Sequence, residues 1–320
     1  MSRQLSLADA VVHPALGRNA KLERIAALID WSQLEPIARR IRSGETGRPP
    51  YDALAMLKAL YLQVMYDLSD PGLEEALLDR ISFRRFCVFA LDATTPDETT
   101  ICRFRQEAAA AGVLAEAFAA INAQLEAKGL MLKKGTLMDA TLIAAKHAPP
   151  KVSSPADLGA RHAGEPGADW TRKGGKALFG YKAHIGADEG SGLVRTLVYT
   201  SAKVNESEVA DRLISGDETA VYADKAYELK ARRLRLKAAG IKDRIMHRRH
   251  KHMARLSPWQ EERNRRIARR RAPIEAVFSA GKRLYGLGRA RYASLARNAA
   301  RAVAVFTIYN LRRASILTAS

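Results

Sequence analysis

The chain has 320 residues, 47% hydrophobic and 27% charged, proportions that indicate a folded protein and exclude a disordered one. Its formal net charge of +19 indicates a polyanionic partner, most often nucleic acid, with a membrane surface as the weaker alternative. No run of about 18 apolar residues and no signal peptide is apparent, so we expect a cytoplasmic protein without a membrane partner. The two cysteines, Cys87 and Cys102, form no CxxC pattern and indicate buried thiols, not disulfides or a cysteine-rich zinc site.

Residues 1–130 are predicted to form an all-helical domain that binds DNA or dimerises. Apolar residues recur at three- and four-residue steps in Tyr51–Leu68, the spacing of an amphipathic helix. Pro71 suits the first turn of the next helix. Two more helices follow before residue 130, the first capped by Asp97 or Thr95.

The second domain, residues 131–320, begins where the sequence changes to short apolar and β-branched segments. The segment 135–146 is a predicted strand, and 177–203 gives two strands around the turn DEGSG. The remaining predicted elements are a helix at 205–216, a strand at 218–224, a helix at 227–240, a strand at 241–248 and helices beyond Pro258. This order predicts a mixed α/β sheet.

A long loop is predicted between the first two strands, at residues 147–176, because Pro, Gly and Ser are frequent there. A loop of this length in a folded domain is usually functional or disordered. Trp170 lies in it beside Arg172. Ordinary packing is the expected use of this indole, and stacking on an unpaired base is the alternative.

Basic residues concentrate in the segment Lys225–Arg291, which holds 22 Lys or Arg against five acids, a local net charge of +17. This density favours phosphate binding over an ordinary solvated face. The cluster HRRHKH at His247–His252 lacks the spacing of a zinc site, so we expect it to bind phosphate as well.

Two aspartates and one glutamate are the candidate catalytic residues. Asp139 and Asp224 follow apolar strand residues, where a lone carboxylate is costly to bury, although each alone also suits a turn. Glu275 lies four residues after Arg271 and seven before Lys282, which places all three near one face of a helix. Taken alone, Glu275 is better explained by an ion pair with Arg271 that stabilises the helix than by a catalytic role. Converging carboxylates in a basic protein indicate Mg²⁺, which can serve phosphoryl transfer.

Several segments resemble the DDE transposases of bacterial insertion sequences, in the branch that groups the four- and five-type elements. The order and spacing of the segments make the resemblance specific, and it covers most of the chain. The segments are MDATLI, FGYKAHIGAD, TSAKVNESEVA, YADKAY and RAPIEAVFSAGK in the second half, and RPPYDALAMLKALYLQVMYDLSDPGLEEAL and PDETTICRFRQ in the first. Two positions depart from the family pattern. Ala226 stands where glycine is usual, and Ala268 stands where some members have tyrosine.

The resemblance implies an α/β fold, a ribonuclease-H-like mixed sheet as catalytic core, preceded by the all-helical domain. It implies that Asp139, Asp224 and Glu275 bind Mg²⁺, for which Mn²⁺ can substitute. The implied activity is DNA cutting and joining during transposition. The implied partner is double-stranded DNA, both the terminal inverted repeats of the element and the target. The resemblance also implies a homodimer on paired element ends and a location at the nucleoid.

Four cationic residues are candidate DNA contacts: Arg271, Lys282, Lys225 and Lys182. Strand alternation puts Lys182 and His184 on one face, opposite Tyr181. Tyr227 is expected to pack beneath the carboxylates. Two alternatives stay open, a non-catalytic DNA-binding protein derived from a transposase and a metal-dependent nuclease without strand transfer.

Overall fold

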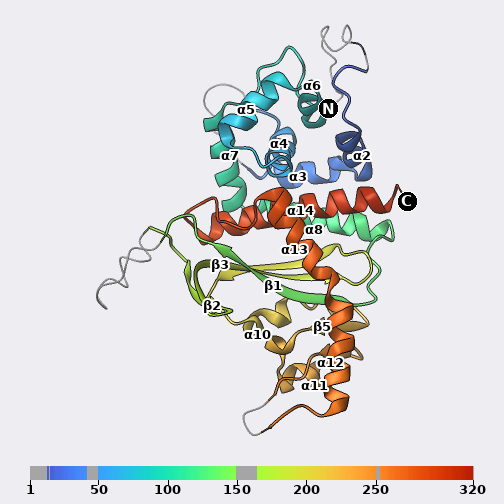
Figure 1. The fold of residues 1–320 in the computed structure, drawn as a ribbon. Helices are drawn as coiled ribbons and strands as arrows, with labels where there is room; N and C mark the ends of the chain where they lie inside the picture. The colour runs from blue at the N-terminus through green and yellow to red at the C-terminus, as the bar shows by residue number, and fades with distance from the viewer. Residues whose placement is uncertain (1–12, 14, 42–49, 149–163, 250–252, 320) are drawn as a thin grey trace. The chain divides into compact units, whose positions relative to one another are not determined.

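The structure is a computed structural model that describes residues 13, 15–41, 50–148, 164–249 and 253–319 (Figure 1). The chain divides into two compact units, residues 1–127 with 303–320, and residues 128–302. The predicted second domain, 131–320, differs from this division because the end of helix α14 (Leu295–Leu317) belongs to the first unit. There Phe306 is fully buried, and Asn310 Nδ2 donates a hydrogen bond of 2.9 Å to Asn122 Oδ1.

The first unit is helical, as predicted. Pro71 lies in the first turn of α5, and Asp97 caps α7 by accepting a hydrogen bond of 2.6 Å from the Thr100 amide. Cys87 is buried, also as predicted, whereas Cys102 is partly exposed. The elements are α2 (Ala20–Leu28), η1 (Trp31–Leu34), α3 (Glu35–Ala38), α4 (Ala53–Met65), α5 (Asp70–Asp79), α6 (Ile81–Cys87), α7 (Glu98–Ala110) and α8 (Val113–Ala127).

Within the described residues, no single helix is long and apolar enough to cross a membrane. The pair α7 and α8 reaches that length and composition only when taken together, and the two helices are bent by 74° at their junction. Both helices contribute buried residues to the first unit, among them Ile101 in α7 and Leu114 and Phe118 in α8. Core packing therefore accounts for their apolar residues.

The second unit is built on one mixed sheet. Its strands are β1 (Thr136–Ala144), β2 (Asp169–Lys173), β3 (Lys176–Asp188), β4 (Val194–Ser201), β5 (Ala220–Ala223) and β6 (Lys242–Ile245). Pairing gives the order β4-β3-β1-β5-β6, in which β3 is antiparallel to β4 and β1 while β1, β5 and β6 are parallel. This is the ribonuclease-H-like arrangement, and it confirms the predicted fold class.

The predicted loop at 147–176 is wrong at its C-terminal end, where residues 169–173 form β2. This strand pairs with the first residues of β3 through a hairpin at Gly174 and Gly175, whose φ angles are +57° and +80°. A two-residue hairpin with both φ angles positive favours glycine. Trp170 packs against Phe179 with ring centroids 5.4 Å apart, so its expected packing role is confirmed. Residues 149–163 of the predicted loop lie outside the described residues.

Gly180 in β3 lies close to the backbone of β1. This residue pairs with Ala144 of β1 and with Asp169 of β2. A Cβ atom built on Gly180 would lie 2.1 Å from the Ile143 carbonyl oxygen and 2.8 Å from the Ala145 amide nitrogen. Because these neighbours are backbone atoms that cannot rotate away, only glycine fits without moving the end of β1.

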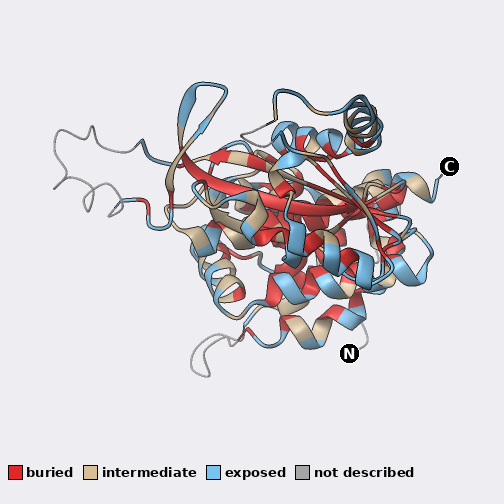
Figure 2. Ribbon diagram, turned by 90° about the horizontal axis from the view of Figure 1, so that it is seen from below, coloured by how far each residue is buried: buried red, intermediate tan, exposed pale blue. Residues whose placement is uncertain are grey.

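Helices lie against both faces of the sheet. On one face, α10 (Glu206–Val209), η2 (Ala210–Arg212) and α11 (Lys230–Ala238) cover a core that includes Met138, Val221 and Tyr227. On the other, α12 (Pro258–Arg271) contacts β5 and α13 (Pro273–Tyr285) contacts β1 (Figure 1). The central strands β1, β3 and β5 are largely buried, whereas the helices expose their outer residues (Figure 2). Alternate residues of β1 and β5 therefore point toward α12 and α13.

His184 makes the folded chain sensitive to acid. Its side chain is fully buried, and Nε2 lies 3.0 Å from Thr200 Oγ1. Burial and the nearby Lys182 ammonium lower the pKa of His184 to about 4. Between pH 6.5 and 4, His184 is therefore protonated in the unfolded chain but not in the native state. Over that interval we expect this residue to lower the free energy of unfolding by about 3 kcal/mol.

Denaturant titrations between pH 7 and 4.5 measure this effect. In His184→Gln, which keeps a polar partner for Thr200 and does not titrate, the pH dependence of unfolding should be distinctly flatter. His13→Gln is the matched control, since His13 is exposed, and should behave as the wild type does. An unchanged slope in His184→Gln would show that other groups cause the acid sensitivity.

Candidate active site

Asp139 and Asp224 lie at the same level on neighbouring parallel strands. β1 and β5 pair Thr136 with Val221 and Leu137 with Tyr222. The same offset carried two residues further aligns Asp139 in β1 with Asp224 just after β5. Since paired strands lie about 4.8 Å apart and residues at one level share a face, both carboxylates point to the α12 and α13 side of the sheet.

Asp139 sits in a partly buried, charged environment. Its side chain is 24% exposed, Oδ1 accepts a hydrogen bond of 2.8 Å from the Ala140 amide, and Oδ2 lies 2.6 Å from Arg271 Nη1. Burial raises the pKa of Asp139, the Arg271 charge opposes that rise, and the Asp224 carboxylate adds to it. A cation near the pair would relieve the repulsion between the two carboxylates.

Asp224 begins the short helix η3 (Lys225–Tyr227) by accepting a hydrogen bond of 2.7 Å from the Ala226 amide. Tyr227 is fully buried, as expected, and its hydroxyl has no hydrogen-bond partner among the described residues. Burial raises the pKa of Tyr227, and the charges of Asp139, Glu206 and Asp224 raise it further. The hydroxyl thus lies within electrostatic reach of both aspartates, on the core side of η3.

Ala226 is compatible with this geometry even though the resembling family usually has glycine there. Among the described residues other than glycine, positive φ angles occur only at Asp67, Val88 and Lys133. Ala226 therefore needs no left-handed conformation, and its methyl group packs against the core of the second unit. The backbone conformation at this position therefore does not require glycine.

Glu275 does not join the two aspartates in this structure. It is exposed in the first turn of α13, and no three His, Cys, Asp or Glu side chains of the described chain lie close enough together to hold a metal ion. The prediction that Arg271, Glu275 and Lys282 share one helical face is wrong for Arg271, because α12 ends at Arg271 and α13, which carries Glu275 and Lys282, begins at Pro273. At this break between the two helices, the Glu275 amide donates a hydrogen bond of 3.0 Å to the Ala272 carbonyl.

The four candidate DNA contacts lie in different surroundings. Arg271 is 16% exposed and paired with Asp139, and its Nε is buried with no hydrogen-bond partner among the described residues. Lys225 and Lys282 are exposed. Lys182 is 6% exposed and binds Glu206 at 2.9 Å and the Val204 carbonyl at 2.8 Å, on the face opposite Asp139. Its ammonium group therefore makes internal contacts, whereas the sequence predicted a contact with DNA.

His247 does not take part in a metal site within the described residues. Its amide donates a hydrogen bond of 2.8 Å to Asn264 Oδ1, and its ring centroid lies 5.7 Å from that of Trp259. Residues 250–252 of the predicted phosphate-binding cluster lie outside the described residues. Sequence analysis missed Trp259, whose exposure becomes apparent only in the folded chain.

Asp139 and Asp224 fit a divalent cation by their chemistry. Both supply hard oxygen ligands at one level of the sheet, the kind that Mg²⁺ takes from one or two carboxylates together with substrate phosphate. Burial raises the pKa of Asp139, and the neighbouring Asp224 carboxylate adds to the rise, so a bound cation would stabilise the ionised pair. The Arg271 guanidinium supplies part of the positive charge beside Asp139.

Comparison with known families gives two matches. Residues 11–107 match a family described as "Transposase domain (DUF772)", and residues 131–311 match one described as "Transposase DDE domain". The second match spans both aspartates, Arg271 and Glu275. No solved structure matches the chain.

Proposed function

The chain belongs to the transposase DDE domain family, which matches it over more than half its length, and we propose that it cuts and joins DNA at the ends of a transposable element. Family membership makes it a DNA transposase with a phosphoryl-transfer chemistry that depends on divalent metal ions. We infer that the ion is Mg²⁺, with Mn²⁺ as a substitute. The observation that carries the proposal is the alignment of Asp139 and Asp224 on neighbouring parallel strands.

In the proposed site, Asp139 and Asp224 hold the cation through carboxylate oxygens. The bound cation supplies Lewis acidity and neutralises charge on the scissile phosphate. Glu275 completes the ligand set when DNA is bound, which requires the first turn of α13 to approach the aspartates. Tyr227 keeps water away from the core side of the pair, because its ring is fully buried beneath η3.

Arg271 has two partners in this proposal. Without DNA it neutralises Asp139 at 2.6 Å. With DNA present, a phosphate offers the guanidinium a second anion with the fork geometry that arginine prefers. Transfer of Arg271 from carboxylate to phosphate frees Asp139 Oδ2 for the cation. Lys225 and Lys282, both exposed, bind phosphates on either side of the scissile bond.

The proposed chemistry consists of two phosphoryl transfers. In the first, water attacks phosphorus, the bond from phosphorus to the 3′ oxygen of the element end breaks, and that oxygen takes up a proton. In the second, the resulting 3′ hydroxyl attacks a phosphodiester of target DNA and displaces another 3′ oxygen. Each step exchanges one phosphorus–oxygen bond for another, so no covalent enzyme–DNA intermediate is needed. Two copies of the chain act on paired ends.

Incubation of the protein with labelled DNA that carries the sequences flanking its gene tests the proposal. We expect Mg²⁺-dependent nicking at the element end, followed by joining to a target plasmid, and no product in EDTA. Glu275→Gln should lower nicking by about 10²-fold or more if Glu275 completes the ligand set. Glu261→Gln is the matched control, since Glu261 is also an acid in the first turn of a basic helix.

Three outcomes would contradict parts of the proposal. DNA binding without nicking would identify a non-catalytic protein derived from a transposase. Nicking without joining would identify a metal-dependent nuclease. Wild-type nicking by Glu275→Gln would remove Glu275 from the ligand set and leave the two aspartates as the only protein ligands.

A further inference from the structure

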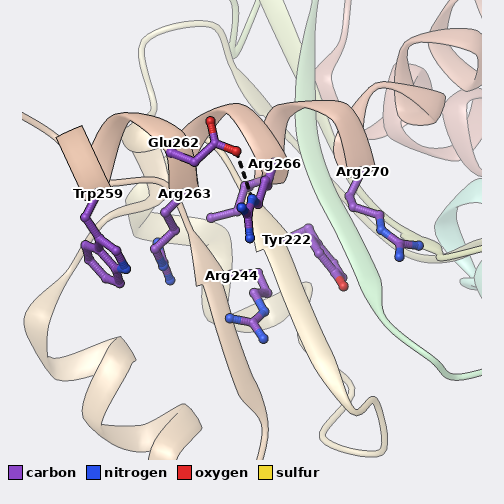
Figure 3. Close-up of a pocket in the computed structure, with 8 residues that line it drawn as sticks. Tyr222, Arg244, Trp259, Glu262, Arg263, Arg266 and Arg270 are labelled. Atoms are coloured by element: carbon purple, nitrogen blue, oxygen red, sulfur yellow. Dashed lines mark hydrogen bonds and ion pairs between the residues drawn. The ribbon is translucent and has the colours of Figure 1, made fainter.

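A basic groove lies between α12 and the β5–β6 edge of the sheet. Its volume is about 440 Å³. The residues that line it are Tyr222, Arg244, Trp259, Glu262, Arg263, Arg266, Ile267 and Arg270. Figure 3 shows the side chains of Trp259 and Arg263 descending from α12, Arg244 rising from the sheet below them and Tyr222 between Arg244 and Arg270. Four arginines and one glutamate give the lining a strong excess of positive charge.

We propose that this groove binds an unpaired strand of DNA, with a base stacked on Trp259 and phosphates held by Arg244, Arg266 and Arg270. The inference rests on the proposed function, which makes DNA the substrate. Duplex DNA fits the observations less well, because the face of an indole ring can stack only on a base whose own face is open.

Trp259 is exposed and held in place. Its side chain is 67% exposed, an unusual position for the largest aromatic residue unless its face is used. The ring centroid of His247 lies 5.7 Å from that of the indole. The His247 amide donates a hydrogen bond to Asn264, which lies on α12 as Trp259 does. The His247 ring thus supports one side of the indole, and restricting its rotation would reduce the entropy lost on stacking.

The arginines of the groove divide into one that builds it and three that face solvent. Arg263 donates hydrogen bonds to the carbonyls of Ile245, at 2.7 Å, and Asp243, at 2.8 Å, and so fixes α12 above β6. Arg266 and Arg270 are more than 70% exposed, with single contacts to Glu262 at 2.8 Å and Glu189 at 3.3 Å.

Arg244 is also exposed and makes no ion pair with the described residues. Surface ion pairs such as those of Arg266 and Arg270 contribute little and exchange readily for phosphate. The three exposed guanidinium groups are therefore available to a phosphate backbone.

The groove leads directly to the candidate active site. Arg270 lines the groove, and Arg271, the next residue, binds Asp139. Trp259 and Arg271 are twelve residues apart on one helix, a distance of about 18 Å. At about 3.4 Å per nucleotide, this corresponds to about five nucleotides of one strand, or fewer if the strand is extended. A strand along α12 would thus place one end near the aspartates and a base near Trp259.

Fluorescence anisotropy in EDTA tests the inference without any cleavage. The probe is a labelled 15-nucleotide single strand, alone or annealed to its complement. In Trp259→Ala we expect about tenfold weaker binding of the single strand, since stacking contributes about 1–3 kcal/mol per base, and a duplex affinity within twofold of wild type. Trp259→Phe should restore most of the affinity. Trp170→Ala is the matched control, because Trp170 packs on Phe179 outside the groove.

The salt dependence separates phosphate contacts from stacking. Arg244→Gln should reduce the slope of log affinity against log salt by about 0.7 for the single strand, the value for one lost phosphate contact, whereas Trp259→Ala should leave the slope unchanged. Equal loss of single-strand and duplex binding in Trp259→Ala, or no loss, would overturn the inference. Because the assay contains no metal, this result is independent of whether the protein cuts DNA. Selective loss with an inactive wild type would uphold the groove and reject the proposed function.

Discussion

Asp224→Asn is expected to lower Mg²⁺-dependent nicking of element-end DNA by about 10³-fold, while DNA binding in EDTA stays within about twofold of wild type. The asparagine removes one negative ligand from the pair on β1 and β5, and metal catalysis contributes several kcal/mol to a reaction of this class. The amide oxygen of asparagine can still accept the hydrogen bond from the Ala226 amide, so η3 and the fold should be preserved.

Single-turnover nicking measures this effect, with thermal unfolding as the check on folding. Asp79→Asn is the control for loss of one acid, because Asp79 is exposed in the first unit. Asp139→Asn should lose nicking to a similar extent, and the double variant should lose no more than either alone, because both aspartates act through one ion. Nicking by Asp224→Asn at the wild-type rate would exclude Asp224 as a metal ligand.

Arg271→Gln is expected to bind Mn²⁺ about tenfold more tightly than wild type in the absence of DNA. In the wild type a cation must displace the guanidinium that lies 2.6 Å from Asp139 Oδ2, and glutamine removes this competition. Nicking should nevertheless fall by about tenfold, since the variant lacks the arginine that holds the phosphate. The two effects have opposite signs, whereas a purely structural role for Arg271 would weaken both metal binding and nicking.

Isothermal titration or electron paramagnetic resonance of Mn²⁺ measures the affinity. The control Arg265→Gln removes an exposed arginine of the same helix, paired with Glu262 outside the site, and should leave Mn²⁺ affinity unchanged. Added duplex DNA should tighten Mn²⁺ binding to the wild type more than to Arg271→Gln. Mn²⁺ affinity in the variant equal to or below that of wild type would exclude competition by Arg271.

The strand-borne part of the site could be predicted from the sequence, because its signals are local. Asp139 and Asp224 each follow short apolar strand residues in the sequence. That their strands are paired neighbours was learned from the structure. The helix-borne part was harder. Pro273 interrupts the helical register between Arg271 and Glu275, and whether a proline ends a helix or lies in its first turn depends on packing.

The positions that sequence analysis misjudged depend on contacts between distant segments. Lys182 is buried because Glu206, from a helix formed 24 residues later, supplies a counter-charge that no local pattern reveals. The basic groove combines Arg244 from β6 with Trp259 from α12, and the charge run alone did not indicate which cations share a surface. The strand β2 was predicted as a loop because its segment is rich in Gly and Pro. The Gly-Gly pair that follows β2 is nevertheless typical of a hairpin.

Gly180 bears on how mutations in this chain should be interpreted. A Cβ at this position would meet the backbone of β1 five residues beyond Asp139, so replacement would shift the strand that carries a proposed ligand. In a screen for lost transposition, a Gly180 substitution would give the same result as the loss of Asp139 or Asp224, although glycine has no side chain to bind metal or DNA. Soluble yield and melting temperature distinguish the two classes, since a ligand variant remains folded and a Gly180 variant does not.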